Sequence, residues 1–361
     1  MKIKAIDVFQ IDLEPHVVRR DAIQAFTKQE TVFVRIRTDE GAEGLGYTYT
    51  IGTGGRAIMA LIRHDLEPHL IGEDPHRIEH IWRKLWFASH ATVVGAITSL
   101  ALCAIDTALW DLRSRLLGQP LHLLLGGAKP RIPVYDTEGG WLNIEQAELV
   151  AGAKASKAKG LRGVKVKVGR PTVQEDLRRL EAVRKAVGDD VEIMVDANQG
   201  FTVSEAIRRT KAFEPVQLAW MEEPLPAEDL NGHIRLSQST ATPIAVGESI
   251  YSISHFREYM QKDACSIVQV DVGRIGGITP WLKVAHTAES FNLWVSPHFL
   301  MELHLPLCCA IPNSQWLEHI PQLSSISAPI RIEGGFAYPS EKPGLGIDWD
   351  REQMKRRQFT L

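Results

Sequence analysis

Three short apolar runs in the middle of this chain each end in a carboxylate. VEIMVDAN ends at Asp196, QLAWMEEP at Glu222 and TPIAVGES at Glu248, with 26 residues from 196 to 222 and 26 from 222 to 248. At the ends of neighbouring parallel strands these carboxylates would converge and repel one another, and a divalent cation relieves that repulsion. Ligation by carboxylates alone favours Mg²⁺, with Mn²⁺ as the alternative, over zinc or copper.

Each of these acids could instead cap the helix that follows it, where a carboxylate is favourable. The equal spacing of all three argues for one shared site. Glu223 follows Glu222 directly, and strand alternation points it away, so we expect Glu222 to be the ligand. Asn198, two residues after Asp196, is expected to add a hydrogen bond at the site and to contact the substrate.

Two lysines lie two residues apart in the run GVKVKVG. On a strand, Lys165 and Lys167 therefore point the same way, into the mouth of the expected barrel. Two close ammonium groups and a nearby cation lower each other's pKa, which predicts a lysine that accepts a proton near pH 7. A solvated edge strand is the alternative, but a closed barrel has no edge.

The next two runs, SIVQVDVG and LWVSPHF, bring Asp271 and His298 to adjacent strand ends. A carboxylate bonded to imidazole holds its tautomer and raises its basicity. This pair is expected across the barrel from Lys167, whereas His304 in the following helix is expected to be structural. Glu318, in NSQWLEH, leaves two alternatives open: a protonated acid that donates to developing negative charge, or a carboxylate paired with a lysine or arginine.

The elements that must position these residues alternate between strand and helix. This pattern predicts the α/β class and a (β/α) barrel of the TIM type, whose chemistry lies at the C-terminal ends of its strands. The expected strands are 132–136 and 162–168, followed by strands that end near 196, 222, 248, 271, 296 and 318. The expected helices are 143–160, 173–188, 203–214, 228–238, 253–262, 277–290 and 300–311.

Three segments are predicted along the chain. Residues 1–125 show strands followed by helices without alternation, which predicts an α+β capping domain. Residues 126–325 form the catalytic barrel. Residues 326–361 return to strand and loop character and are expected to pack back on the capping domain.

Composition sets limits on partners and location. The 361 residues are 44% hydrophobic and 24% charged, and the net charge of −3 provides no basic field for nucleic acid or an anionic membrane. No apolar run approaches the ~20 residues of a spanning helix, and the first residues do not resemble a signal peptide. The four cysteines lack CxxC spacing, so we expect a cytoplasmic protein.

A cation, a lysine and a histidine–aspartate pair together suit the removal of a proton next to a carboxylate. The cation would bind the substrate carboxylate and stabilise an enediolate. The expected partner is therefore a small hydroxy-carboxylate.

The motifs VKVKVG, VDAN, WMEEP, VGES, VDVGRIGG, SPH and WLE, with DTALWDLRSRLLGQPLHLLLGG before them, resemble the mandelate racemase branch of the enolase superfamily over nearly the full length. The resemblance implies Mg²⁺ at the three carboxylates, Lys167 as one base tuned by Lys165, and His298 with Asp271 as the other. It also implies that Glu318 is the acid on the substrate carboxylate. Arg274 and VQVDVG disfavour the muconate-lactonising and dipeptide-epimerase branches, which carry a lysine on the sixth strand.

Two reactions follow from the same first step. Return of a proton to the α-carbon racemises a 2-hydroxy acid, whereas protonation of a 3-hydroxyl releases water and gives a 2-keto-3-deoxy acid. In the cap loops, Arg19, Arg20, Thr48 and Thr50 are expected to bind substrate and suit a polyol diacid, which favours dehydration of an acid sugar; the alternative is that they are surface residues.

The sequence leaves a non-catalytic function open and disfavours a zinc-dependent one. A barrel that binds a carboxylate without turning it over would need neither the lysine pair nor the histidine pair. A zinc hydrolase is disfavoured, because the expected ligand set lacks the histidines that bind zinc in such enzymes. We expect a homo-oligomer, but the sequence determines neither its size nor the substrate and its stereochemistry.

Overall fold

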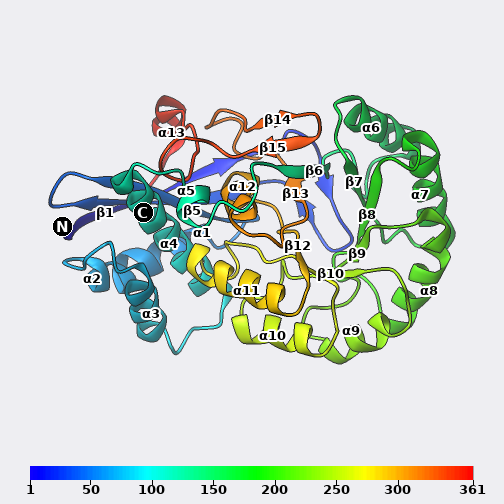
Figure 1. The fold of residues 1–361 in the computed structure, drawn as a ribbon, viewed down its shortest axis with the longest axis horizontal. Helices are drawn as coiled ribbons and strands as arrows, with labels where there is room; N and C mark the ends of the chain where they lie inside the picture. The colour runs from blue at the N-terminus through cyan, green and yellow to red at the C-terminus, as the bar shows by residue number, and fades with distance from the viewer. Residues whose placement is uncertain (361) are drawn as a thin grey trace.

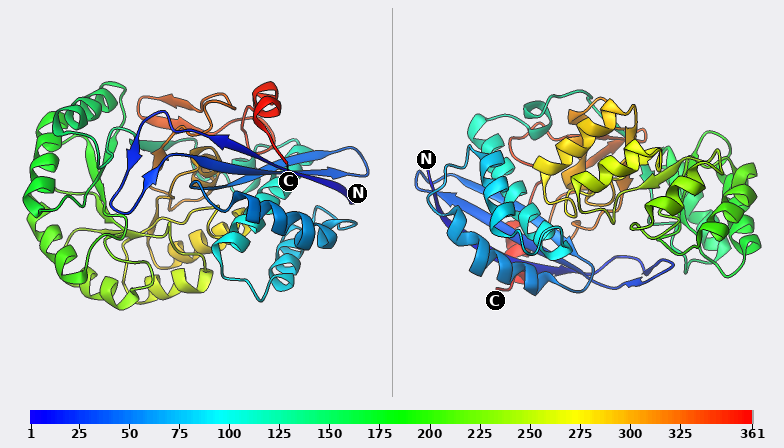
Figure 2. Two further views of the ribbon diagram at one scale, coloured as in Figure 1. Left: turned by 180° about the vertical axis from the view of Figure 1, so that it is seen from behind. Right: turned by 90° about the horizontal axis from the view of Figure 1, so that it is seen from below.

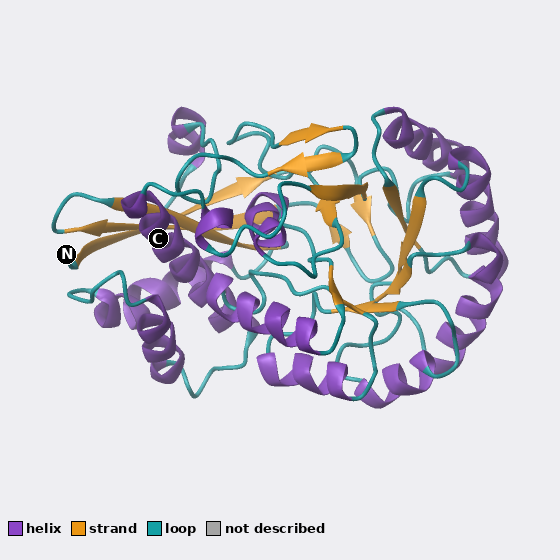
Figure 3. Ribbon diagram, viewed as in Figure 1, coloured by secondary structure: helices purple, strands orange, loops and turns teal. Residues whose placement is uncertain are grey.

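The computed structural model describes residues 1–360 and shows a barrel with a smaller sheet-and-helix domain beside it (Figure 1). The apolar runs form strands and the amphipathic segments between them form helices, which lie outside the strands (Figure 3). The barrel elements are β6 (Ile132–Asp136), α6 (Gln146–Ala158), β7 (Gly163–Lys167), α7 (Val173–Val187), β8 (Glu192–Asp196), α8 (Val203–Phe213), β9 (Trp220–Glu222), α9 (Leu230–Ser237), β10 (Ile244–Val246), α10 (Ile253–Gln261), β11 (Ile267–Val268), α11 (Ile278–Ser290), β12 (Trp294–Val295), α12 (Met301–Ala310) and β13 (Leu317–His319).

The barrel strands are parallel and pair in chain order from β6 to β12, and β13 pairs with β6. Val295 on β12 closes the ring, because its N–H donates to Asn313 O at 2.8 Å and its carbonyl accepts from Gln315 N at 2.8 Å. This confirms the predicted barrel and its eight strands.

The period of two along each strand builds the interior in layers. Met194 and Trp220 belong to an apolar cluster inside the barrel. Asp196 and Glu222 follow two residues later on the same strands and therefore share that interior face. The polar layer is thus placed directly above an apolar one, at the C-terminal ends of β8 and β9.

Later strands are shorter than the sequence predicts. β10 ends at Val246, β11 at Val268 and β12 at Val295, so the expected site residues 248, 271 and 298 lie in the loops that follow. Single hydrogen bonds continue the ladder past these ends, from Gln269 N to Val246 O at 2.8 Å and from Ser296 N to Val268 O at 3.0 Å.

The N-terminal domain is a three-stranded antiparallel sheet covered by helices on one face. A two-stranded hairpin leaves this sheet and extends toward the barrel (Figure 2). The elements are β1 (Ile3–Leu13), β2 (Arg19–Arg20), β3 (Ala25–Phe26), β4 (Gln29–Thr38), β5 (Glu43–Thr50), α1 (Gly55–Leu61), a π-helical turn (Ile62–Leu66), α2 (Glu67–Leu70), α3 (Ile78–Ala88), α4 (Ala96–Leu117) and α5 (Leu121–Leu124).

The two faces of β5 have different partners. Gly44 and Gly46 lie against the backbone of α4, while Tyr47 and Tyr49 belong to the cluster of apolar residues that includes the barrel. The α4 helix is buried on most of its faces and ends at Leu117, where Gly118, with a left-handed φ of 63°, caps it.

The C-terminal segment contacts both domains. β14 (Arg331–Glu333) and β15 (Phe336–Tyr338) extend the barrel sheet antiparallel from β6. Farther on, α13 (Arg351–Arg357) leads to Phe359, whose carbonyl accepts from Gln10 N on β1 at 2.9 Å. The Trp349 ring packs edge-on against Tyr47. The boundaries near 125 and 325 stay predictions.

None of the helices within residues 1–360 is long and apolar enough to cross a membrane.

We predict that Gly46→Ala destabilises the protein, because an added Cβ would overlap Ala108 N and Ala104 O on α4. The expected loss in the free energy of unfolding is about 1–3 kcal/mol, measured by urea denaturation. Gly139→Ala is the matched control, because its Cβ would meet Gly152 at an ordinary 3.5 Å. Equal stability of the two variants would contradict this packing argument.

Candidate active site

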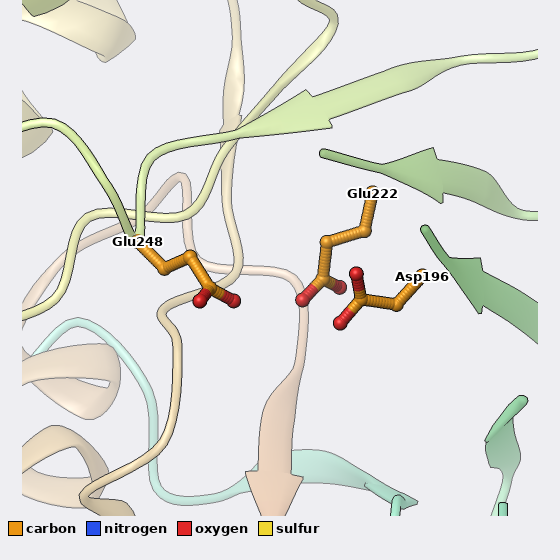
Figure 4. A group of neighbouring side chains, drawn as sticks. All are labelled: Asp196, Glu222 and Glu248. Atoms are coloured by element: carbon orange, nitrogen blue, oxygen red, sulfur yellow. The ribbon is translucent and has the colours of Figure 1, made fainter. Parts of the chain in front are cut away.

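Three carboxylates meet at the barrel mouth. Asp196 ends β8, Glu222 ends β9 and Glu248 follows β10, and all three are buried. One ligand oxygen from each lies within 4.8 Å of the others. Figure 4 shows the three side chains pointing into a common space. The predicted ligand set is therefore brought together, with Glu222 and not Glu223 as its second member.

The donor set fits a hard divalent cation. Burial and the charge of Asp196 raise the pKa of Glu222 to about 7, so the cluster favours added positive charge. Trp220 Nε1 and Gln269 Nε2 donate to Glu222 Oε2 at 3.1 and 2.7 Å, which orients that carboxylate. Glu223 has a different partner, since Gln199 Nε2 donates to its Oε2 at 3.3 Å.

The lysine pair lies beside these acids. Lys165 Nζ is 2.7 Å from both Glu222 Oε1 and Glu318 Oε1, and Lys167 pairs with Asp196. Burial and the Lys165 charge act to lower the pKa of Lys167, as expected, but Asp196 outweighs them and the pKa is raised. The carboxylates among which the lysines are buried therefore outweigh the mutual repulsion of the two ammonium groups. The lowering that a bound cation would add stays a prediction.

His298 and Asp271 form the expected pair. His298 Nδ1 lies 2.8 Å from Asp271 Oδ2, and His298 Nε2 lies 3.3 Å from Glu248 Oε2. Burial opposes ionisation of Asp271, but the hydrogen bond and charge of His298 lower the pKa of Asp271 to about 2. Burial also acts to lower the pKa of His298, yet the charges of Glu248 and Asp271 raise it.

Glu318 adopts the second of its two alternatives. Burial favours its neutral form, but Lys165 outweighs burial and the pKa of Glu318 is lowered. Its oxygens accept from Thr137 Oγ1 at 2.6 Å and from Phe299 N at 2.7 Å. It is a carboxylate paired with lysine in this arrangement.

The structure brings the arginine hairpin, but not the threonines, to the barrel. Arg19 is 1% exposed, and Glu138 in the loop after β6 accepts from its guanidinium. The Arg20 side chain is exposed. Thr48 and Thr50 point to the opposite face of β5 from Tyr49, and Thr50 Oγ1 donates to Glu30 Oε2 at 2.9 Å. Asn198 is buried, and its Oδ1 has no hydrogen-bond partner.

Several contacts at the mouth were not predicted from the sequence. The Tyr49 hydroxyl donates to Asp271 Oδ2 at 2.7 Å. Lys167 Nζ lies 5.1 Å from the centre of the Trp141 ring. Arg274, which in the sequence only disfavoured two branches of the superfamily, donates to Glu248 O at 3.0 Å. For Tyr49 the sequence held one signal: strand alternation in YTYT places its side chain on the other face of the strand from Thr48 and Thr50.

His304 is structural, as expected. Val272 N donates to His304 Nε2 at 3.0 Å, and Phe299 O lies 2.9 Å from Nδ1. A backbone N–H only donates and a carbonyl only accepts, so the proton is on Nδ1. Burial lowers the pKa of His304 to about 4.

Comparison with known families agrees with this geometry. Residues 5–126 match the family described as "Mandelate racemase / muconate lactonizing enzyme, N-terminal domain", and residues 148–353 match "Enolase C-terminal domain-like".

Individual relatives match over nearly the whole chain. The chain is 36% identical to an L-talarate/galactarate dehydratase of Salmonella typhimurium, covering 92% of this chain and 84% of that one. It superposes with a TM-score of 0.95 and 33% identity on a Streptomyces coelicolor racemase with bound magnesium, covering 99% and 100%. It superposes on a Polaromonas L-talarate dehydratase complexed with Mg and L-glucarate with a TM-score of 0.94 and 36% identity, covering 99% of this chain and 97% of that one.

We predict that acid destabilises the protein partly through His304. In the unfolded chain this imidazole protonates near 6.5, but in the fold only near 4, so the unfolded state binds more protons between these values. The free energy of unfolding should therefore fall as pH drops from 6.5 to 4, by at most about 3 kcal/mol from this group. Denaturation of His304→Gln across this range should show a shallower fall; an unchanged slope would contradict the assignment.

Proposed function

Because this chain belongs to the mandelate racemase / muconate lactonizing enzyme family of the enolase superfamily, we propose that it is a magnesium-dependent dehydratase of acid sugars. The product would be a 2-keto-3-deoxy acid. The observation that carries the proposal is one cluster of three carboxylates with Lys167 in contact at Asp196 and the His298–Asp271 pair in contact at Glu248.

Asp196, Glu222 and Glu248 would hold Mg²⁺, with Mn²⁺ as the alternative, and relatives of known structure carry magnesium. When bound, the cation supplies positive charge that stabilises a substrate carboxylate and its enediolate. Lys165 and Lys167 now share the negative charge of these acids. Neutralisation of that charge would weaken the hold on the Lys167 proton and lower its pKa toward the value that a base requires.

The proton steps are assigned to the chain's own groups. Lys167 takes the proton from the α-carbon, and the electron pair left behind forms the enediolate. His298, protonated on both nitrogens beside Asp271, gives a proton to the 3-hydroxyl, which leaves as water. The resulting enol becomes the 2-keto-3-deoxy acid. Glu318 with Lys165 lies beside the carboxylate cluster, where together they would contact the substrate carboxylate.

The remaining substrate contacts stay predictions. The Oδ1 of Asn198 is buried without a partner and would accept from a substrate hydroxyl. Arg19 is neutralised by Glu138, so we propose that it holds the hairpin over the mouth and that Arg20, which is exposed, contacts the substrate from the hairpin. The geometry gives no support to Thr48 and Thr50. The partner is a small hydroxy-carboxylate; a homo-oligomer remains an expectation.

Racemisation of a 2-hydroxy acid is the second candidate. Lys167 and His298 contact different members of the carboxylate cluster, so the site has a base on each of two sides. Two bases suit the removal and return of a proton on opposite faces of one carbon. A Streptomyces coelicolor relative is described as a racemase.

We predict that the enzyme with Mg²⁺ converts at least one aldonate or aldarate in an acid-sugar library to a 2-keto acid. Lys167→Ala and His298→Asn should each reduce the rate by at least about 10³-fold, the scale of general acid–base catalysis. The measurement is a colorimetric 2-keto acid assay. If no acid sugar is turned over but the enzyme exchanges the α-proton of another 2-hydroxy acid in D₂O, the racemase would be favoured. A non-catalytic barrel would be favoured if the wild type exchanges no α-proton and both variants bind a carboxylate ligand as tightly as the wild type does.

We predict that Glu222→Gln weakens Mg²⁺ binding by more than about 100-fold, because a direct ligand is lost where even outer contacts matter 10–100-fold. Isothermal titration calorimetry with MgCl₂ measures this without substrate. Glu223→Gln is the matched control, since Glu223 is equally buried but lies outside the ligand group, and its affinity should stay within threefold. A larger effect at 223 than at 222 would reassign the ligand.

A further inference from the structure

One side chain of the N-terminal domain reaches the histidine pair in the barrel. The Tyr49 hydroxyl donates to Asp271 Oδ2 at 2.7 Å, and these residues are 222 positions apart in the sequence. The same oxygen lies 2.8 Å from His298 Nδ1. Tyr49 and His298 therefore share one acceptor atom.

The other oxygen of Asp271 is held locally. Gly273 N and Arg274 N donate to Asp271 Oδ1 at 2.7 and 3.1 Å. These donors belong to the loop that carries the carboxylate and move with it. Of the donors to Asp271 that the described residues provide, Tyr49 and His298 are the ones that come from other segments, and only Tyr49 comes from the capping domain.

Tyr49 is itself held rigidly. It is 2% exposed, its ring meets the Phe299 ring edge-on with centres 4.9 Å apart, and the Arg274 guanidinium lies 6.0 Å from its centre. Phe299 directly follows His298. Burial raises the pKa of Tyr49 well above its ordinary value, so the hydroxyl keeps its proton and acts as a donor.

We propose that Tyr49 is a positioning residue that couples the docking of the capping domain to His298. Its hydroxyl fixes the plane of the Asp271 carboxylate, which in turn fixes the direction in which His298 Nε2 faces the pocket. Lys167 is held by Asp196 and the Trp141 ring instead, with no part played by Tyr49. The inference rests on the proposed function and deepens it: proton transfer through His298 depends on the cap, and removal of a proton by Lys167 does not.

The test compares Tyr49→Phe with Tyr47→Phe in the full-length, Mg²⁺-loaded enzyme. Tyr47 is a matched control because it lies on the same face of β5 and is 0% exposed, while its hydroxyl has no hydrogen-bond partner. The probes are galactarate and L-talarate, which differ in configuration at one α-carbon. Deuterium exchange at that carbon and 2-keto acid formation are followed in D₂O, and each rate is assigned to the base whose removal, in Lys167→Ala or His298→Asn, abolishes it.

We expect Tyr49→Phe to slow the steps that require His298 by about 10-fold or more, the loss of one hydrogen bond to a charged acceptor. Exchange that depends on Lys167 alone, KM, and all rates of Tyr47→Phe should stay within twofold. Equal slowing of both classes of step, or no slowing of either, overturns the proposal.

A measurement that needs no turnover separates this inference from the proposed function. The His298 Nδ1 proton, identified in the NMR spectrum by its loss in His298→Asn, should shift in Tyr49→Phe and not in Tyr47→Phe, because its acceptor loses a competing donor. An unchanged position overturns the positioning role. If the shift occurs but no acid sugar exchanges its α-proton in the wild type, the proposed function fails and the coupling of cap to imidazole stands.

Discussion

The balance of buried charge at the barrel mouth is the constraint on which the rest of the structure depends. Asp196, Glu222 and Glu248 are close enough to repel strongly, and burial removes the water that would screen them. Lys165 and Lys167 supply part of the compensating charge. The same contacts raise the lysine pKa values, so the groups that stabilise the cluster are also those whose protonation a bound cation would change.

Both candidate bases contact this one cluster of carboxylates. Lys167 contacts Asp196 on one side and His298 contacts Glu248 on the other. A barrel makes this arrangement simple, because each strand end contributes one side chain to a shared space. Dehydration and racemisation therefore require the same framework, and the difference between them lies in what the histidine does after the first proton has moved.

The capping domain is part of this framework. Its hairpin ties Arg19 to Glu138 in a barrel loop, and Tyr49 on β5 bonds Asp271. Gly46 on the other face of β5 allows the close approach of α4. The sheet that carries Tyr49 is thus fixed from behind by helix packing and from the front by the barrel, and the imidazole that Asp271 orients depends on both.

The sequence by itself determined the repeat and the faces. Equal spacing located the acids, and alternation placed Lys165 and Lys167 together, because the period of a strand is a local property. Tertiary structure alone decided that Tyr49 meets Asp271, that Thr48 faces away from the mouth, and that the surrounding carboxylates outweigh the mutual repulsion of the two lysines. Those outcomes depend on the combined interactions of each side chain with residues far away in the chain. Local periodicity carries no information about distances between domains or about which of several opposing charges prevails.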